Sequence, residues 1–245
     1  MKKAANVNGV LDQTYAMNRQ YKPHFVFRYK VRAKIVAMSA KKYLGISKAL
    51  RILDFGAAEG LTFLEFRRLL PLGTYVGIED SDELFQRVFL DGQSDSLIIK
   101  GDVTKLPNNV KDASYDIVSA LAILEHLSNP IEAVHQAKMA LRPGGIFIAT
   151  CPSPSWDIIS TRLGLLAGDQ HASKMDKKYM INIMQEAGLE VLSYQRFMWA
   201  PIGLLPYIKI HISPSFSLIL DQIISRLKIF NWLFVNQYVI ARKPL

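Results

Sequence analysis

Two hydrophobic patterns alternate along the middle of the chain. Short apolar runs of five or six residues are separated by stretches in which apolar positions recur every three or four residues. The first pattern predicts buried strands and the second predicts helices packed against them. Strands that alternate with helices predict a parallel sheet covered on both faces, so we expect an α/β fold. The expected strands are 51–55, 74–79, 96–100, 115–120 and 146–151.

Start and stop signals mark the helices between these strands. Ser81 is a good N-cap, and the acids that follow it suit the positive end of a helix. Asn129 precedes Pro130, which fits the first helical position, and Glu132 can complete a capping box. We expect the Pro-Gly-Gly run at 143–145 to close that helix. The expected helices are 61–70, 130–141, 156–167 and 176–187, together with a basic helix that follows Pro23 within 21–44.

The last third of the chain is less regular. We expect two more strands, at 189–198 and 232–241, with residues 201–230 between them. Prolines interrupt that segment, but its apolar residues fall at helical spacing, which predicts a partly helical lid. We divide the chain into a basic helical segment, 1–50, and a main domain, 51–245. The apolar residues of the lid are Phe216, Leu220, Ile223, Leu227 and Phe230.

The positive charge is concentrated at the front of the chain. The net charge is +9, and residues 1–51 hold twelve Lys or Arg and one acid, Asp12. Such a block attracts the phosphates of nucleic acid or of anionic lipid. The alternative is a solvated helix face that has no partner.

The single cysteine and the lengths of the apolar runs limit the class of protein. Cys151 has no partner for a disulfide within the chain and cannot build a thiolate metal cluster; its apolar neighbours predict a buried thiol. No apolar run follows the first residues, and none reaches the ~20 residues of a membrane span. We expect a cytoplasmic chain, and peripheral contact with the inner face of a membrane stays open.

The candidate chemistry lies at the carboxyl ends of the first strands, where sheets of this kind bind ligands. Residues 54–60 form a turn with Gly56 and Gly60, and small residues allow a ligand to approach the backbone. Glu79 ends the second strand, where a carboxylate can accept both hydroxyls of a ribose. Asp102 follows the third strand.

This turn could also belong to a dinucleotide site, because Glu79 follows Gly60 at close to the ~20 residues typical of such sites. The glycine spacing argues against that interpretation. Ala58 and Leu61 stand where the second and third glycines of the fingerprint belong.

Five segments, in order, resemble the class I S-adenosylmethionine-dependent methyltransferases. They are 52–60, 76–79, 101–103, 115–118 and 141–145, and Ala58 replaces the usual middle glycine of the first. The resemblance implies a Rossmann-like sheet of seven strands, mostly parallel, with the last strand antiparallel. It also implies S-adenosylmethionine as cofactor, with Glu79 on the ribose, Asp102 at the adenine amino group and Val103 packed on the adenine ring. The cofactor-binding candidates are Asp54, Gly56, Ala58, Gly60, Glu79, Asp80, Asp102, Val103 and Leu121.

Some of these acids have plainer interpretations. Asp54 could orient the backbone of its loop, and Glu79 could be a solvated strand end. We expect Asp116 to orient backbone and leave it out of the site.

His126 is a catalytic candidate, because residues 124–127 resemble the small-molecule branch of the family, which includes ubiquinone-biosynthesis methyltransferases. The position of a metal-binding acid in some related O-methyltransferases is Ala122 here, so we expect no metal. His126 is either a general base or a histidine that lines the cofactor or packs in the core.

His171 is the second catalytic candidate. In the same branch, a histidine after the fifth strand faces the acceptor, and Asp169 could orient this imidazole. The alternative is a loop histidine in solvent.

The resemblance implies in-line methyl transfer to a hydroxyl, amine or carbon of a small or lipid-like acceptor. The apolar lid and the basic front segment together favour an anionic membrane surface. The lid could instead pack on its own core or across a dimer. A nucleic-acid (RNA) methyltransferase and a non-catalytic S-adenosylmethionine-binding protein are the alternatives. The sequence contains no Asn/Asp-Pro-Pro-Tyr/Phe motif and no added RNA-binding module, so we do not expect a nucleic-acid partner.

Overall fold

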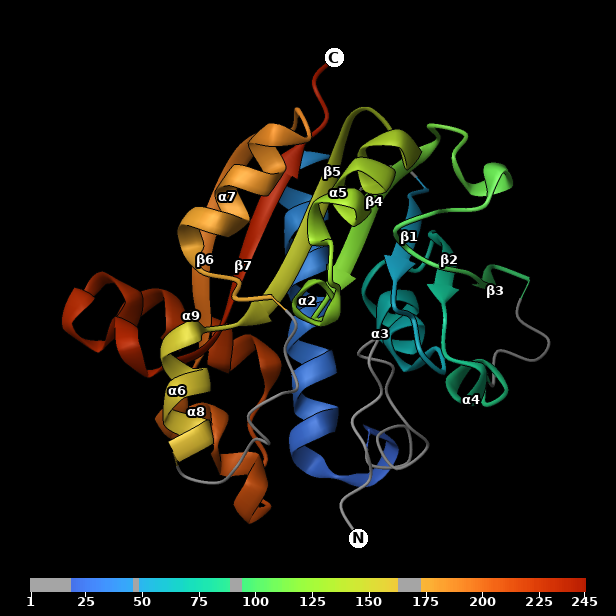
Figure 1. The fold of residues 1–245 in the computed structure, drawn as a ribbon. Coiled ribbons are helices and arrows are strands. Elements are labelled where there is room, and N and C mark those ends of the chain that lie inside the picture. Colours follow the sequence, from blue (N-terminus) through green and yellow to red (C-terminus); the bar gives the residue numbers. More distant parts are fainter. Residues whose placement is uncertain (1–18, 46–48, 89–93, 163–172) are drawn as a thin grey trace, which may run out of the picture.

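The fold is built on one mixed sheet with the strand order β3-β2-β1-β4-β5-β7-β6. The structure is a computed structural model that describes residues 19–45, 49–88, 94–162 and 173–245 (Figure 1). Only β7 runs antiparallel to its neighbours, β5 and β6, which confirms the expected Rossmann-like sheet with an antiparallel last strand. The strands are β1 (Arg51–Phe55), β2 (Thr74–Glu79), β3 (Ser96–Lys100), β4 (Tyr115–Leu121), β5 (Leu141–Pro152), β6 (Glu190–Trp199) and β7 (Phe234–Arg242).

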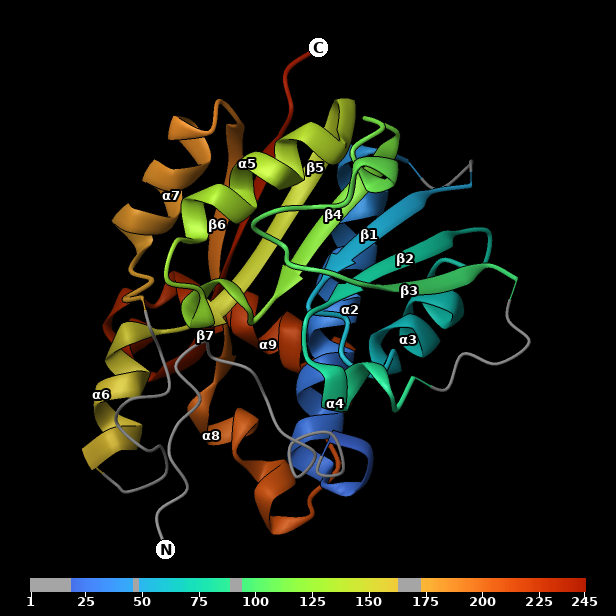
Figure 2. The same ribbon diagram turned by 45° about the vertical axis from the view of Figure 1, so that its right-hand side comes forward.

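Helices cover both faces of the sheet, and each face has its own apolar core. The helices α2, α3 and α9 pack on one face, and α5 and α7 pack on the other (Figure 2). The long helices are α2 (Pro23–Tyr43), α3 (Leu61–Leu69), α5 (Pro130–Ala140), α7 (Lys177–Glu186) and α9 (Pro214–Arg226). The shorter ones are α4 (Asp82–Phe85), α6 (Pro154–Arg162), α8 (Ala200–Gly203), η1 (Asn108–Val110), η2 (Leu124–His126), η3 (Leu205–Ile208) and η4 (Lys228–Leu233).

The basic helix α2 belongs to the core of the protein. Its apolar side chains, among them Phe27, Val31 and Val36, are buried, while Lys41 and Lys42 are exposed near its C-terminus. Cations there are favourable because the helix dipole is negative at that end. The helix begins at Pro23, as expected, and proline suits the first helical position.

The strand β5 begins earlier than the sequence indicated. The Pro-Gly-Gly run does not follow the helix directly, because α5 ends at Ala140 and Leu141 already pairs with Tyr115. The chain then bulges before regular pairing resumes. Gly144 has φ +73°, and a Cβ at Gly145 would lie 3.0 Å from the carbonyl oxygen of Tyr115, so both glycines permit the bulge.

One of the two expected helix caps is present. Ser81 Oγ accepts a hydrogen bond from Leu84 N at 3.3 Å. The prediction of a capping box at Asn129 is wrong, because the side chain of Asn129 makes no capping hydrogen bond. Glu132 is engaged elsewhere: its Oε1 accepts from Gln136 Nε2 at 2.8 Å.

The segment between β6 and β7 is helical in pieces, as expected of the lid: α8, η3, α9 and η4. Among the described helices, none is long and apolar enough to cross a membrane. The helix expected at 156–167 is α6, which starts two residues earlier, at Pro154. The part of that expectation beyond residue 162 lies outside the described residues. Cys151 is fully buried in β5, as predicted.

Candidate cofactor site

The loop after β1 crosses the carboxyl end of β2. The backbone N–H groups of Gly56 and Ala57 both donate to Ile78 O, at 2.9 and 3.1 Å. Three residues of this short loop are left-handed: Gly56 (φ +70°), Ala58 (φ +50°) and Gly60 (φ +92°). Ala58 accepts this conformation although a residue with a Cβ adopts it at a cost of about 1–2 kcal/mol. The loop therefore keeps the shape of a glycine turn despite the substitution.

Glu79 fastens this loop to the end of β2. Its buried carboxylate accepts from Ala58 N through Oε2 and from Ser81 N through Oε1, both at 2.8 Å. Burial raises the pKa of Glu79, and the two N–H donors act in the opposite direction. Each oxygen accepts one of these bonds, and a carboxylate oxygen can accept two. Glu79 is thus held in place at the strand end and retains acceptor capacity.

The side chain of Asp54, in β1, contacts Ser119 of β4. Its fully buried carboxyl group accepts the hydroxyl of Ser119 at 2.6 Å. Burial raises the pKa of Asp54 to about 7, and the Ser119 hydrogen bond opposes the shift. A cation brought to this carboxyl group would favour its ionised form.

Glu59 is a buried carboxylate with few partners. It is 0% exposed, and neither oxygen accepts a hydrogen bond from the described residues. The guanidinium of Arg19 lies 3.5 Å from Oε1, and its charge also lowers the pKa values of Asp54 and Glu79. Three buried acids therefore share one nearby cation. The sequence analysis missed Arg19, because nothing distinguishes it from the other bases of the front segment.

The remaining cofactor candidates lie along the same edge of the sheet, at the ends of β2, β3 and β4. Asp80 is exposed, and its carbonyl oxygen accepts from Lys100 Nζ. The exposed Asp102 carboxylate accepts from Thr104 N at 2.7 Å. The other two candidates are Val103, which is buried, and Leu121, which is partly buried.

His126 lies just beyond the end of β4, in η2. It is partly buried, and its backbone N–H donates to Ile123 O at 2.9 Å. Ser173, which precedes α7, contacts the same turn: its N–H donates to Glu125 O at 3.1 Å and its hydroxyl to Leu127 O at 2.9 Å. The turn that holds His126 is therefore packed against the segment leading into α7.

His171 and Asp169 lie outside the described residues.

Asp116 is structural, as expected: its carboxylate accepts hydrogen bonds from Arg51 N at 2.9 Å and from Arg142 Nε at 2.7 Å. Within the part of the chain that the structure describes, no group of three His, Cys, Asp or Glu could hold a metal ion.

A family model described as a methyltransferase domain matches residues 23–194. The chain belongs to this methyltransferase family. The match begins at the start of α2 and includes every cofactor candidate above. It confirms the expected S-adenosylmethionine-dependent methyltransferase, with S-adenosylmethionine as the cofactor.

Two curated proteins resemble part of this methyltransferase. An uncharacterized methyltransferase, C1B3.06c, of Schizosaccharomyces pombe is 30% identical over 110 residues, which is 41% of this chain and 39% of that protein. An uncharacterized 37.1 kDa protein in transposon TN4556 of Streptomyces fradiae is 27% identical over 113 residues, 44% of this chain and 31% of that protein. The similarity thus spans less than half of either relative.

Solved structures share the fold of this methyltransferase at low sequence identity. A chain in the complex between the Haloferax volcanii Trm112 methyltransferase activator and a methyltransferase has a TM-score of 0.67 at 15% identity, covering 95% of this chain and 96% of that one. Phosphoethanolamine N-methyltransferase 2 of Haemonchus contortus, solved with S-adenosyl-L-methionine, has a TM-score of 0.62 at 14% identity, covering 97% and 61%. At these identities the likeness establishes the fold alone.

The residues present fit the methyltransferase's cofactor. S-adenosylmethionine carries a sulfonium and an ammonium, and three buried acids, Asp54, Glu59 and Glu79, converge beside the glycine loop. Buried carboxylates are stable when a cation pairs with them, and Arg19 is a cation whose charge reaches all three. The unsatisfied oxygens of Glu59 in particular suit a cationic ligand.

Proposed function

We propose that this enzyme transfers the methyl group of S-adenosylmethionine to a small, lipid-like acceptor at the surface of an anionic membrane. One observation carries the membrane part of the proposal: exposed apolar side chains are concentrated within residues 207–232, where the exposed charged side chains are positive. We call this set of apolar side chains the apolar face. It consists of Tyr207, Ile208, Ile210, Phe216, Ile219, Ile223, Leu227, Ile229 and Trp232.

The apolar face is concentrated in the segment between β6 and β7. Of the 18 large apolar side chains exposed in the described residues, these nine lie within 207–232. Phe216, Ile219, Ile223 and Leu227 follow one another at helical spacing and are each at least 53% exposed. Exposed apolar side chains that form a contiguous patch often mark an interaction site. Leu218 and Ile224 of α9 are buried, so the lid packs partly on the core and leaves this set of side chains exposed.

The charges around the apolar face favour an anionic bilayer. Lys209, Arg226 and Lys228 are exposed among its residues. The acid in this segment, Asp221, is only 3% exposed, and both of its oxygens accept backbone hydrogen bonds. Apolar side chains with cations beside them are the composition of helices that lie in a membrane interface.

Contacts with α2 connect the apolar face to the basic front segment. His24 stacks on the ring of Tyr207 with centroids 4.0 Å apart, and Arg28 Nη2 donates to the Tyr207 hydroxyl at 2.7 Å. No acid occurs in α2. We therefore propose that segment 1–50 adds to the attraction for anionic lipid.

Liposome co-sedimentation tests the membrane proposal. We expect the protein to sediment with vesicles of phosphatidylcholine and phosphatidylglycerol, to bind pure phosphatidylcholine weakly, and to be released by salt. Serine at both Ile219 and Ile223 should weaken sedimentation at least tenfold, because each buried Ile contributes about 1.5–3 kcal/mol. Leu64→Ser, at an exposed apolar position on α3, is the matched control.

Equal sedimentation of the double variant and wild type would refute the proposal. If the double variant instead converts a dimer to a monomer, the apolar face is a dimer interface. Salt-sensitive RNA binding would favour the nucleic-acid alternative. Transfer of tritiated methyl from S-adenosylmethionine to a lipid extract then tests the acceptor class.

The cofactor supplies an already activated methyl group, so the chain mainly has to orient the acceptor and exclude water. In our proposal Glu79 accepts the ribose hydroxyls, Asp102 meets the adenine amino group and Val103 packs on the ring. The loop from Gly56 to Gly60 runs along the rest of the cofactor. Asp54, Glu59 and Glu79 are buried acids beside it, and the positive charge of the cofactor would favour their ionised forms.

We also propose His126 as a general base for a hydroxyl acceptor. His126→Ala should then lower kcat by about 10²–10⁴-fold, the usual contribution of proton transfer, and leave S-adenosylmethionine affinity within twofold of wild type. Steady-state turnover together with calorimetric titration measures both quantities. His171, oriented by Asp169, is the other candidate. If His126→Ala and His171→Ala each keep full turnover, neither of these histidines is a general base.

A further inference from the structure

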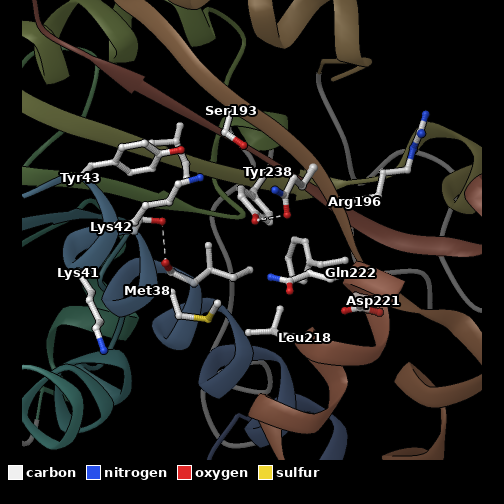
Figure 3. A pocket seen from close by; sticks show the side chains of 15 residues that line it. Met38, Lys41, Lys42, Tyr43, Ser193, Arg196, Leu218, Asp221, Gln222 and Tyr238 are labelled. Carbon is white, nitrogen blue, oxygen red and sulfur yellow. Dashed lines mark hydrogen bonds between the residues drawn. The ribbon is translucent and has the colours of Figure 1, made fainter. Parts of the chain in front are cut away.

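A groove of about 590 Å³ lies between α2 and α9, on the face of the sheet formed by β6 and β7 (Figure 3). This volume is within the range of pockets that hold small molecules. Side chains from the C-terminal half of α2, from the strands β6 and β7 and from α9 line the groove. Segments far apart in the sequence thus enclose one space.

The walls of the groove are mainly apolar. Met38 of α2, Leu218 of α9 and Phe197 of β6 contribute apolar side chains to its lining. Figure 3 shows Met38 and Leu218 next to each other at its lower side. Uncharged polar groups are also present. The Tyr238 hydroxyl donates to Gln195 Oε1 at 2.7 Å, which leaves the amide N–H₂ of Gln195 available.

More basic than acidic side chains line the groove. Lys41 and Lys42 of α2 and Arg196 of β6 contribute to its lining. Figure 3 shows Lys41 and Arg196 extending away from its centre, whereas Lys42 extends over the ring of Tyr43, with Nζ 4.9 Å from the centroid. Lys42 is therefore the cation best placed to meet a ligand.

The carboxylate of Asp221, the acid that lines the groove, accepts hydrogen bonds from the protein backbone. Its Oδ2 accepts from Met198 N at 2.8 Å and its Oδ1 from Trp199 N at 2.9 Å. The carboxylate is thereby held against β6 rather than offered to the groove. The groove thus combines apolar walls with a positive side.

The groove is separate from the cofactor site. None of the nine cofactor candidates lines it, and none of the strands β1 to β4 contributes to it. The methyl-transfer reaction therefore does not account for this space.

We propose that the α2/α9 groove binds one amphiphilic molecule, with its anionic head group near Lys42 and its apolar chain against Met38 and Leu218. Apolar walls with a few polar groups at one side are the usual composition of a small-molecule site. The ligand is either a free fatty acid or a single lipid taken from a bilayer, because the two share this chemistry.

Calorimetric titration of the full chain with sodium dodecanoate below its micelle concentration tests the proposal. We expect one dodecanoate per chain, at least tenfold weaker binding of dodecanol, and no displacement by saturating S-adenosylmethionine. Competition by phosphatidylglycerol vesicles would identify a bilayer lipid as the source of the ligand. Binding that vesicles leave unchanged would identify a free fatty acid.

Two pairs of variants locate the site. Gln222→Trp fills the groove from its exposed rim and should abolish binding, whereas Ile223→Trp, one residue further on α9, should preserve it. Lys42→Glu should weaken dodecanoate about tenfold and leave dodecanol unchanged; Lys178→Glu, exposed on α7, is its control. Circular dichroism confirms that each variant is folded.

Three results would overturn the proposal. The first is no saturable binding of dodecanoate by the wild type. The second is equal binding by folded Gln222→Trp. The third is displacement by S-adenosylmethionine, which would place the amphiphile at the methyl-transfer site. If the protein binds dodecanoate but does not sediment with vesicles, the proposed membrane contact is refuted and the proposed groove ligand is not.

Discussion

Replacement of Glu79 by Ala is expected to weaken S-adenosylmethionine binding by about 1–3 kcal/mol, the usual contribution of a hydrogen bond to a charged group and of the donors left unpaired. Two effects add. The ribose loses its proposed acceptor, and the N–H groups of Ala58 and Ser81 lose the carboxylate that fixes the loop. Calorimetric titration with S-adenosylmethionine measures the change as roughly a 5- to 150-fold rise in Kd.

Glu79→Gln is the informative companion, because it keeps one side-chain oxygen and the volume of the side chain. We expect an affinity between those of wild type and Glu79→Ala. Asp82→Ala removes a nearby acid whose side chain is 82% exposed and should leave affinity unchanged. Unchanged affinity in folded Glu79→Ala would mean that the ribose lies elsewhere. A parallel titration with NADH should show no binding.

Asp221→Ala is expected to lower the free energy of unfolding by about 2–6 kcal/mol, because each buried donor left unsatisfied costs about 1–3 kcal/mol. The two donors are the backbone N–H groups of Met198 and Trp199. Met198 has φ +58°, so the carboxylate supports a strained end of β6. Urea denaturation followed by circular dichroism measures the loss.

Two further variants separate this role from general disturbance of α9. Asp221→Asn keeps one acceptor oxygen and should lose less stability than Asp221→Ala. Gln222→Ala, at the exposed neighbouring position, should change stability by less than about 0.5 kcal/mol, as surface substitutions usually do. If Asp221→Ala matches wild type, the two backbone N–H groups must be satisfied by water.

The elements that the sequence predicted best depend on local pattern. The bounds of β1, β2 and β3 agree with the expected strands, because each is a short apolar run ended by turn residues. The edge that gathers the glycine loop, Glu79 and Asp102 was predictable for a related reason. Parallel strands place their carboxyl ends together whatever the helices do.

The features that the sequence did not reveal depend on contacts between distant residues. Asp221 precedes Arg226 and Lys228 in the sequence and resembles part of a solvated face, yet its partners lie on β6. The pairing of Arg19 with Glu59 joins residues 40 positions apart. The α2/α9 groove likewise exists only after α9 has packed near the C-terminal half of α2.

The burial of Cys151 in the middle of the sheet makes the molecule convenient to label. The wild-type chain offers its single thiol no exposure to a maleimide while it remains folded. A cysteine introduced at an exposed position would therefore carry a fluorophore or spin label alone, without removal of a native residue. A label at residue 223 would report on depth in a bilayer, and one at residue 222 on occupancy of the groove, in the same protein background.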